Sequence, residues 1–278
     1  MKVNCEKRTK KTGFTIVELL TVMSVIILLI SLLVPALNEV KRFAKGVKQK
    51  AQFHSISVAL DLFNAEQEGY PPSSQEDASG NPYCGAMKLA EAMVGKDLRG
   101  FNPLSTFSFS DDGKNQNYYT GDTLEGRRSY LNLEGIDAMQ IQDLYGEADC
   151  IAKGFDPCEV VLCDIYRRPT TATGKKAGMP VLYYRANTSN TGHDPNSSDF
   201  AVDNIYNYYD NHILTELNSY NVIELNPLYN NFSLFYRITQ NKRVNIDTPR
   251  RADSYILMSA GMDGLYGTGD DVFNFEKQ

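Results

Sequence analysis

The stretch that decides the fold is GFTIVELLTVMSVIILLISLLVPAL, residues Gly13 to Leu37. From Phe14 onwards it is an apolar run with one charged residue, Glu18. About 20 apolar residues are enough for a helix to cross the hydrocarbon core of a membrane, so we expect a transmembrane helix over residues 14–37. A lone carboxylate in such a helix costs on the order of a few kcal/mol unless it is paired. Because the run holds no basic residue, we expect the partner of Glu18 to come from another chain or from a new charge near Phe14.

Charges are sorted along the chain. The first thirteen residues carry a net charge of +4, from five basic residues against Glu6, whereas the whole chain carries −6, which leaves −10 for the rest. The positive-inside rule therefore predicts a cytoplasmic leader over residues 1–13 and a body on the far side of the membrane. A body this acidic is a poor match for nucleic-acid phosphates, so we expect no nucleic-acid partner.

A secretory signal peptide is the alternative interpretation, with Val34-Pro35-Ala36 as a cleavage site. Such signals usually have an apolar core of about 7–15 residues, and an acidic residue inside the core is unusual. The length of the run and Glu18 both disfavour this alternative.

Residues 7 to 37 resemble the class III signal of type IV pilins and of type II secretion pseudopilins. The shared features are the basic leader, the Gly-Phe junction, the glutamate, and the apolar helix with Pro35 at a helix-loosening position. The resemblance implies that a prepilin peptidase cuts between Gly13 and Phe14, that Phe14 is then N-methylated, and that Glu18 is needed for assembly. Cleavage would place an α-amino group four residues before Glu18, and in a filament Glu18 would meet the α-amine of a neighbouring subunit.

Beyond Leu37 the pattern becomes amphipathic. Apolar residues recur every three to five positions and predict that the helix continues over residues 38–66 into the folded body: Val40, Phe43, Val47, Ala51, Ile56, Ala59, Leu60 and Phe63. Gly69 and the Pro71-Pro72 pair end it. The stretch ALDLFNAEQEGYP, residues 59–71, resembles the end of the first helix in major pseudopilins, which favours a secretion apparatus over an adhesive pilus.

The body, residues 67–278, has few regular segments in its first half. We expect residues 73–177 to form an irregular surface insertion with short helices at 85–94 and 136–145 and a strand at 159–166. Runs of β-branched and aromatic residues predict strands at 179–187 and 253–261, and a helix is expected within 226–241, packed by Leu228, Phe232, Phe235 and Tyr236. The predicted architecture is α+β and pilin-like: a long N-terminal helix packed on a small antiparallel sheet, with irregular inserts.

Four cysteines lie beyond the apolar run: Cys84, Cys150, Cys158 and Cys163. In an oxidising compartment they allow three pairings, among which the sequence does not choose. Buried free thiols are the alternative. A zinc site is disfavoured, because there is no Cys-x-x-Cys and the three histidines have no ligand spacing to the cysteines.

The chain closes with SAGMDGLYGTGDDVFNF, residues 259–275. Glycines that let a backbone wrap, together with aspartates, suit a hard cation such as Ca²⁺, although the spacing is not that of an EF-hand. The stretch resembles the Ca²⁺-binding C-terminal loop of major pseudopilins. That resemblance implies side-chain ligands from Asp263, Asp270 and Asp271, with Leu265 and Thr268 as carbonyl ligands. A pair of Gly-Asp turns without metal is the alternative.

Taken together, the sequence predicts a structural subunit and not an enzyme. The leading hypothesis is a pseudopilin of a type II secretion system, anchored in the bacterial inner membrane with its body in the periplasm. Its partners would be the membrane, the prepilin peptidase, the inner-membrane assembly platform, other pseudopilins and further copies of itself in a filament. A type IV pilin for adhesion, motility or DNA uptake is the alternative, and a membrane-tethered periplasmic enzyme or binding protein is a distant one, because neither Gly-x-Ser-x-Gly nor a phosphate-binding loop is present.

Overall fold

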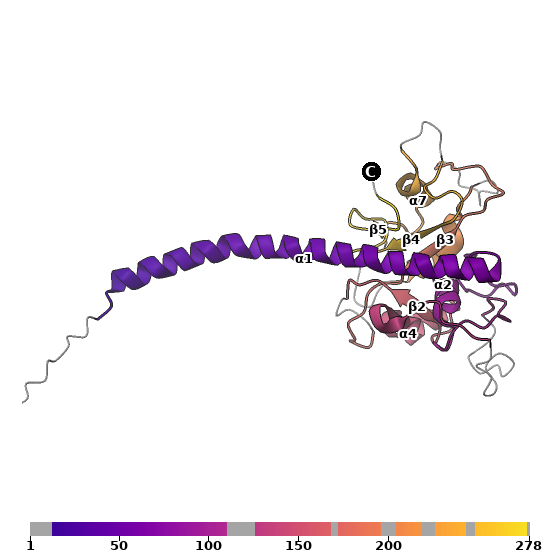
Figure 1. Ribbon diagram of the computed structural model, residues 1–278, viewed down its shortest axis with the longest axis horizontal. Helices are drawn as coiled ribbons and strands as arrows, with labels where there is room; N and C mark the ends of the chain where they lie inside the picture. The colour runs from indigo at the N-terminus through magenta and orange to yellow at the C-terminus, as the bar shows by residue number, and fades with distance from the viewer. Residues whose placement is uncertain are drawn as a thin grey trace, which may run out of the picture. The chain divides into compact units, whose positions relative to one another are not determined.

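The computed structural model describes residues 13–109, 126–167, 172–195, 204–217, 226–242 and 248–276. The chain is α+β and divides into two compact units, Met1–Lys45 and Gly46–Gln278. The long helix α1 (Ile16–Gln67) runs through the boundary between them (Figure 1).

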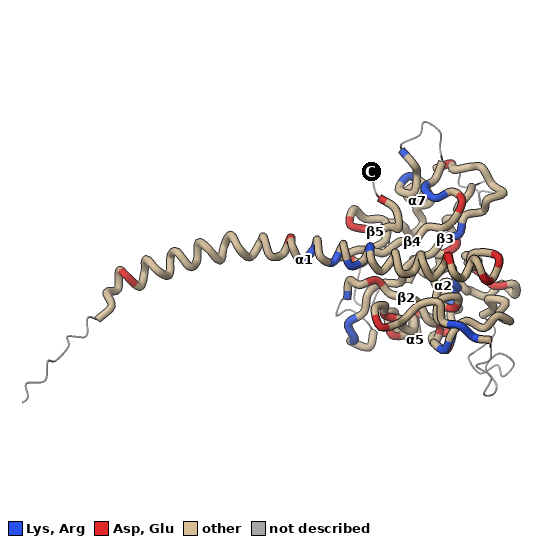
Figure 2. Tube along the Cα trace, in the orientation of Figure 1, with Lys and Arg blue, Asp and Glu red and all other residues tan. Residues whose placement is uncertain are grey.

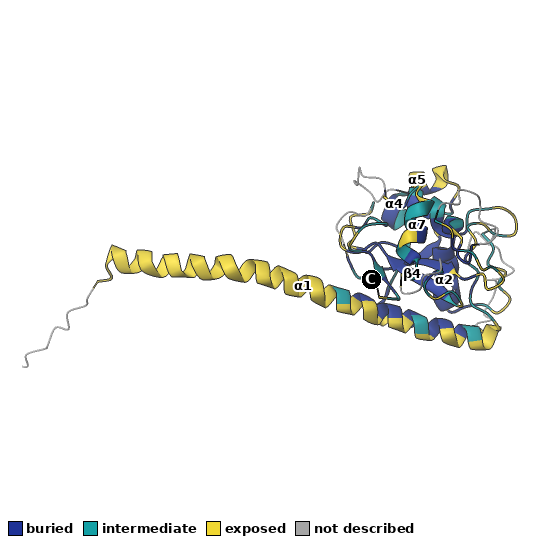
Figure 3. Ribbon diagram, turned by 90° about the horizontal axis from the view of Figure 1, so that it is seen from above, coloured by how far each residue is buried: buried dark blue, intermediate teal, exposed yellow. Residues whose placement is uncertain are grey.

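Within the first unit, every described residue is solvent-exposed, as the yellow ribbon of this part of α1 shows (Figure 3). Up to Leu37, α1 holds no charged residue other than Glu18 in its first turn, and Pro35 lies inside the helix. By length and composition α1 is able to cross a membrane, with a mean hydropathy of 2.8 over its most apolar 18 residues. These properties are consistent with a single-pass membrane protein.

The remaining part of α1, in the second unit, buries one face. Ile56, Ala59, Leu60 and Phe63 are buried as expected, but Ala51 is exposed. Two glutamines begin the buried face instead. Gln52 Nε2 donates to the Cys163 carbonyl at 2.7 Å, and Gln49 Oε1 accepts from the Ile165 N–H at 3.0 Å. These two buried side-chain amides therefore form hydrogen bonds with backbone groups at and just after the end of β2 (Val160–Cys163).

A three-stranded antiparallel sheet has the order β3-β4-β5, with β3 at Leu182–Arg185, β4 at Tyr255–Ser259 and β5 at Val272–Phe273. Leu182 pairs with Met258, and Met258 pairs with Phe273. The strands expected at 179–187 and 253–261 are confirmed in shorter form. A second antiparallel pair joins β1 (Asp137–Gln140) to β2 (Val160–Cys163), and a bridge from Cys163 to Pro180 links this pair to the segment before β3.

The short helices are α2 (Gly85–Val94), α4 (Ile141–Tyr145), α5 (Glu147–Ala152), α6 (His212–Glu216) and α7 (Phe232–Thr239), with 3₁₀ turns η1 (Leu133–Gly135) and η2 (Tyr208–Asn211). The helices expected at 85–94 and within 226–241 are confirmed. The helix expected over 136–145 is wrong in its first half, because residues 137–140 pair with β2 and the helix is confined to 141–145.

The expectation that residues 73–177 form a surface insertion does not hold for α2 and β2. All ten residues of α2 and all four of β2 are buried. The described part of this region therefore supplies α2 and β2 to the core, together with buried residues of α4 and α5.

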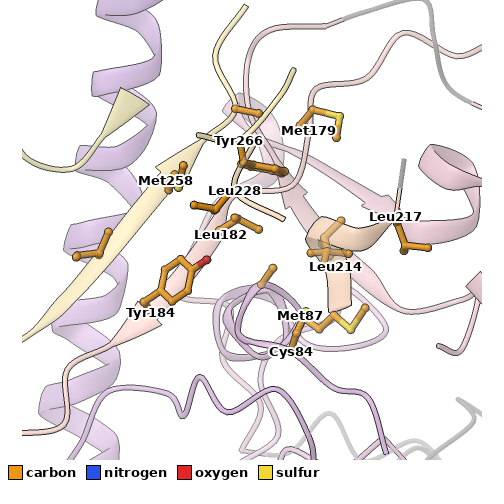
Figure 4. Packing of buried hydrophobic residues seen from close by; sticks show 14 of the residues in the cluster. Cys84, Met87, Met179, Leu182, Tyr184, Leu214, Leu217, Leu228, Met258 and Tyr266 are labelled. Carbon is orange, nitrogen blue, oxygen red and sulfur yellow. The ribbon is translucent and has the colours of Figure 1, made fainter. Parts of the chain in front are cut away.

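The two faces of the β3–β4 pair contact different sides of the core. Tyr183 and Leu257 belong to the cluster that contains the buried face of α1, whereas Leu182, Tyr184 and Met258 belong to the cluster that contains Leu228, Phe235 and Tyr266. Figure 4 shows the second cluster, in which these side chains meet Cys84 and Met87 of the α2 region. Alternation along the strands thus places the sheet between α1 and the α7 side of the body.

Candidate functional site

Thr15 and Glu18 cap the N-terminus of α1. The Thr15 N–H donates to Glu18 Oε2 at 2.9 Å, the Thr15 hydroxyl donates to the same oxygen at 2.7 Å, and the Glu18 N–H donates to Thr15 Oγ1 at 3.3 Å. This reciprocal arrangement is a capping box, in which an N-cap Thr and the Glu three residues later satisfy each other's backbone N–H groups. Glu18 therefore has hydrogen-bond partners within its own chain.

These hydrogen bonds were not expected from the sequence, and the charged partner expected from another chain or from a new charge near Phe14 stays a prediction. The Thr-x-x-Glu spacing was present in the sequence and is the signal that would have predicted the cap. A carboxylate here also lies at the positive end of the helix dipole. Gly13 lies just before the cap, and a Cβ built on it would meet no atom within 4 Å. The fold therefore does not require glycine at position 13.

The C-terminal acidic loop is fixed to the core by Tyr266. Its side chain is buried, its hydroxyl donates to the Pro180 carbonyl at 2.5 Å, and its carbonyl accepts from the Leu228 N–H at 2.9 Å. The loop closes at Gly261, which has a φ of +65° and whose added Cβ would lie 2.4 Å from the Asp270 carbonyl. Only glycine permits this approach.

Four of the five residues predicted to bind Ca²⁺ are brought together. Asp270 Oδ2 accepts from the N–H groups of Met262 and Asp263 at 2.6 and 3.0 Å, so the two aspartates lie at one point of the loop. The Thr268 hydroxyl lies 2.6 Å from Asp270 Oδ1 and 3.3 Å from the Leu265 carbonyl oxygen. The hydroxyl of Thr268 thus faces the Asp270 carboxylate. The fifth residue, Asp271, is buried and accepts from the Gly267 N–H at 3.0 Å.

The two neighbouring carboxylates perturb each other. Burial raises the pKa of the Asp263 carboxyl, and the nearby Asp270 carboxylate raises it further. Burial alone would also raise the pKa of Asp270, but the hydrogen bonds from Thr268 and from backbone N–H groups outweigh it and lower the pKa. Negative charge is therefore concentrated on Asp270, and Asp263 gains its charge less readily.

A set of ligands made only of oxygen atoms suits Ca²⁺, which takes six to eight oxygen ligands. Two carboxylates, one hydroxyl and one carbonyl supply part of that number. Among the residues that the structure describes, no group of three or more His, Cys, Asp or Glu side chains is arranged to hold a metal ion. A Ca²⁺ ion at this loop would therefore need further oxygen ligands from backbone carbonyls or water.

Of the four cysteines of the body, Cys84, Cys150 and Cys163 are buried free thiols and Cys158 is exposed. Burial raises the pKa of Cys84 to about 11 and that of Cys150 to about 12. A thiol with so high a pKa holds almost no thiolate at neutral pH and is chemically inert. For these three residues the structure agrees with the alternative of buried thiols and gives no support to disulfides.

No family model, no curated protein and no solved structure matches this chain.

Proposed function

We propose that the protein is a structural subunit of a type II secretion pseudopilus. In this proposal a prepilin peptidase cuts between Gly13 and Phe14, Phe14 is N-methylated, and copies of the chain assemble with one another and with other pseudopilins through the apolar part of α1. Before assembly the chain is anchored once in the bacterial inner membrane, with its body in the periplasm.

The observation that carries the proposal is the beginning of α1. An apolar helical segment with every side chain exposed needs lipid or other helices around it, and a single carboxylate stands in its first turn (Figure 2). An ordinary membrane anchor needs no carboxylate there. A subunit that pairs with the α-amino group of a neighbour does, because opposite charges attract strongly in a medium of low dielectric constant.

The acidic loop adds a second element to the proposal. Asp263, Asp270, Leu265 and Thr268 would hold Ca²⁺, which would supply positive charge between the two carboxylates and tie the loop together. Asp271 would act indirectly by holding the backbone at Gly267. The sheet end that the loop covers, at β5, would be stabilised as a consequence.

The first test is the mass of the N-terminal peptide of the protein purified from its own membranes. We expect a chain that starts at N-methylated Phe14. Gly13→Val should abolish this processing without affecting the fold, since a Cβ at position 13 meets nothing within 4 Å. Gly46→Val is the matched control, because a Cβ there also meets nothing within 4 Å. A start near Leu37, or an intact Met1, would contradict the proposal.

The second test separates the cap from assembly. Glu18→Gln keeps the size of the side chain and removes its charge, and Thr15→Val removes the hydroxyl of the capping box and leaves the Glu18 charge. We expect Glu18→Gln to abolish cross-linking between subunits in membranes and Thr15→Val to retain most of it, while both variants still insert. Glu39→Gln is the control, because Glu39 is an exposed residue of the same helix. Equal loss in the Thr15 and Glu18 variants would mean that Glu18 acts only as a helix cap.

A type IV pilin would pass both tests. Electron microscopy of cells that overproduce the protein distinguishes the two filaments by their location. Filaments confined to the periplasm and loss of protein export on deletion support the pseudopilus, whereas long surface filaments with intact export support the pilus.

A further inference from the structure

A cavity of about 280 Å³ lies between the end of α7 and the C-terminal segment of the body. Three segments far apart in sequence line it: Arg237, Ile238, Gln240 and Lys242 from the end of α7 and the residues after it, Arg250 alone, and Thr268, Gly269, Phe275 and Glu276 from the C-terminal segment. The cavity lies beside the acidic loop, since Thr268 belongs to both.

The fold brings three basic side chains to this cavity. Gln240 and Pro249 form an antiparallel bridge, and the Arg250 N–H donates to the Thr239 carbonyl at 2.8 Å. These contacts hold Arg250 next to the end of α7, where Arg237 occupies the last turn. Blue segments around α7 mark basic residues in Figure 2. The three cations thus converge through backbone pairing and not through a continuous basic run.

An aromatic wall positions one of the cations. The Arg250 guanidinium lies 5.8 Å from the centre of the Phe275 ring, which stacks on the ring of Phe273 in β5 with a centroid separation of 4.8 Å. A guanidinium over an aromatic face keeps its N–H donors free at its edge. Arg250 is therefore oriented by the Phe275 ring, and among the described residues no carboxylate forms an ion pair with it.

Charge in the cavity is unbalanced. Within the described part of the chain, Arg237, Lys242 and Arg250 form no ion pair with a carboxylate, and Glu276 is the one acidic residue in the lining. The lining therefore carries a net charge of +2, in a chain whose residues after the first thirteen sum to −10. Cations gathered in one small cavity repel one another unless an anion joins them.

We propose that this cavity is a binding site for a small dianion, namely inorganic phosphate or a phosphate monoester. Two guanidinium groups suit phosphate because their planar forks donate paired hydrogen bonds to its oxygens, and Lys242 adds a point charge. The volume is near the lower end of the range for ligand pockets and admits a compact anion. The charge of a dianion matches the net charge of the lining.

The test is calorimetric titration of inorganic phosphate into the full-length protein in a maltoside detergent at low ionic strength and pH 8. We expect saturable binding of one phosphate per chain. Arg237→Gln and Arg250→Gln should each weaken binding about tenfold, which corresponds to about 1.4 kcal/mol. Arg99→Gln and Lys176→Gln remove exposed cations elsewhere and should leave the affinity unchanged.

The charge of the ligand gives an independent check. Inorganic phosphate loses its second negative charge near neutral pH and a phosphate monoester near pH 6, whereas sulfate stays a dianion. We therefore expect phosphate to bind more weakly at pH 5 than at pH 8 and sulfate to bind equally at both.

Absence of saturable phosphate binding would overturn the proposal, as would equal weakening in the Arg99 and Arg237 variants. Thermal unfolding of each variant reports whether the fold survives. If Arg250→Gln unfolds, Arg237→Gln carries the test, because Arg237 is exposed.

Discussion

Leu60 and Leu62 offer a sharp test of how α1 packs on the body. They stand two residues apart on the same helix, yet Leu60 is 0% exposed and Leu62 is 44% exposed. Leu60 belongs to the cluster that also holds Phe63 of α1 and Tyr183 and Leu257 of the sheet. Substitution of both leucines by alanine removes the same atoms from two different environments.

Leu60→Ala should destabilise the second unit by about 2–5 kcal/mol, because it loses the transfer free energy of the buried side chain and leaves a cavity. Leu62→Ala should change the free energy of unfolding by no more than about 0.5 kcal/mol. For a unit of this size, each kcal/mol shifts the melting temperature by about 2–4 °C, so the Leu60 variant should melt about 4–20 °C lower.

The measurement is thermal unfolding of the full-length protein in detergent, followed by near-ultraviolet circular dichroism, to which the many buried tyrosines contribute. Equal shifts for the two variants would refute the packing of this face of α1. A large effect of Leu62→Ala on filament cross-linking with a normal melting temperature would instead place Leu62 in a contact between subunits.

Three further predictions concern titration, metal and thiols. Burial raises the pKa of Asp210 to about 8, so between about pH 4 and pH 8 the folded state holds a proton that the unfolded state has lost, and this contribution to stability falls as pH rises, by up to about 1.4 kcal/mol per pH unit. Asp210→Asn should flatten the pH dependence of the urea midpoint between pH 5 and 7, and unchanged slopes would contradict the assignment. If Ca²⁺ binds the acidic loop, chelation should lower the melting temperature by about 5–10 °C at calcium concentrations near 100 times the dissociation constant. Asp263→Asn and Asp270→Asn should abolish that difference and Asp253→Asn should preserve it; an equal melt with and without chelator would exclude the site. Finally, native protein treated with iodoacetamide should be alkylated at Cys158 well before Cys84, Cys150 or Cys163, as peptide masses would show, and early modification of a buried thiol would mean that the core opens locally.

The sequence pattern predicted the long helix and the two principal strands, because an apolar run and runs of β-branched and aromatic residues are local features of the sequence. The helix at 85–94 was predictable for the same reason. Sequence failed where a distant partner decides the local structure. Residues 137–140 are extended because β2 offers them an antiparallel partner, and Gln49 and Gln52 are buried because a strand end offers them backbone groups.

The candidate sites divide in the same way. The acidic loop is contiguous in sequence, so its ligand candidates could be named in advance, although only the structure distinguishes the role of Asp271 from that of Asp270. Arg237, Lys242 and Arg250 gave no signal, because the pairing of residues 240 and 249 and the position of Phe275 bring them together. Residues that are brought together only by tertiary contacts show no characteristic spacing in the sequence.

The interpretation of Glu18 depends both on the sequence and on the structure. The hydrogen bonds from Thr15 and the positive end of the helix dipole offset part of the cost of a carboxylate in an apolar segment. They do so without neutralising its charge, since a hydrogen-bonded carboxylate remains an anion. In the proposed function this is the state that assembly requires: the single chain inserts with Glu18 capped and still charged, and the α-amino group of a neighbouring Phe14 supplies the opposite charge that Thr15 lacks. In this proposal, capping and assembly are successive roles of one carboxylate, and the cap lowers the cost of keeping it charged until the partner subunit binds.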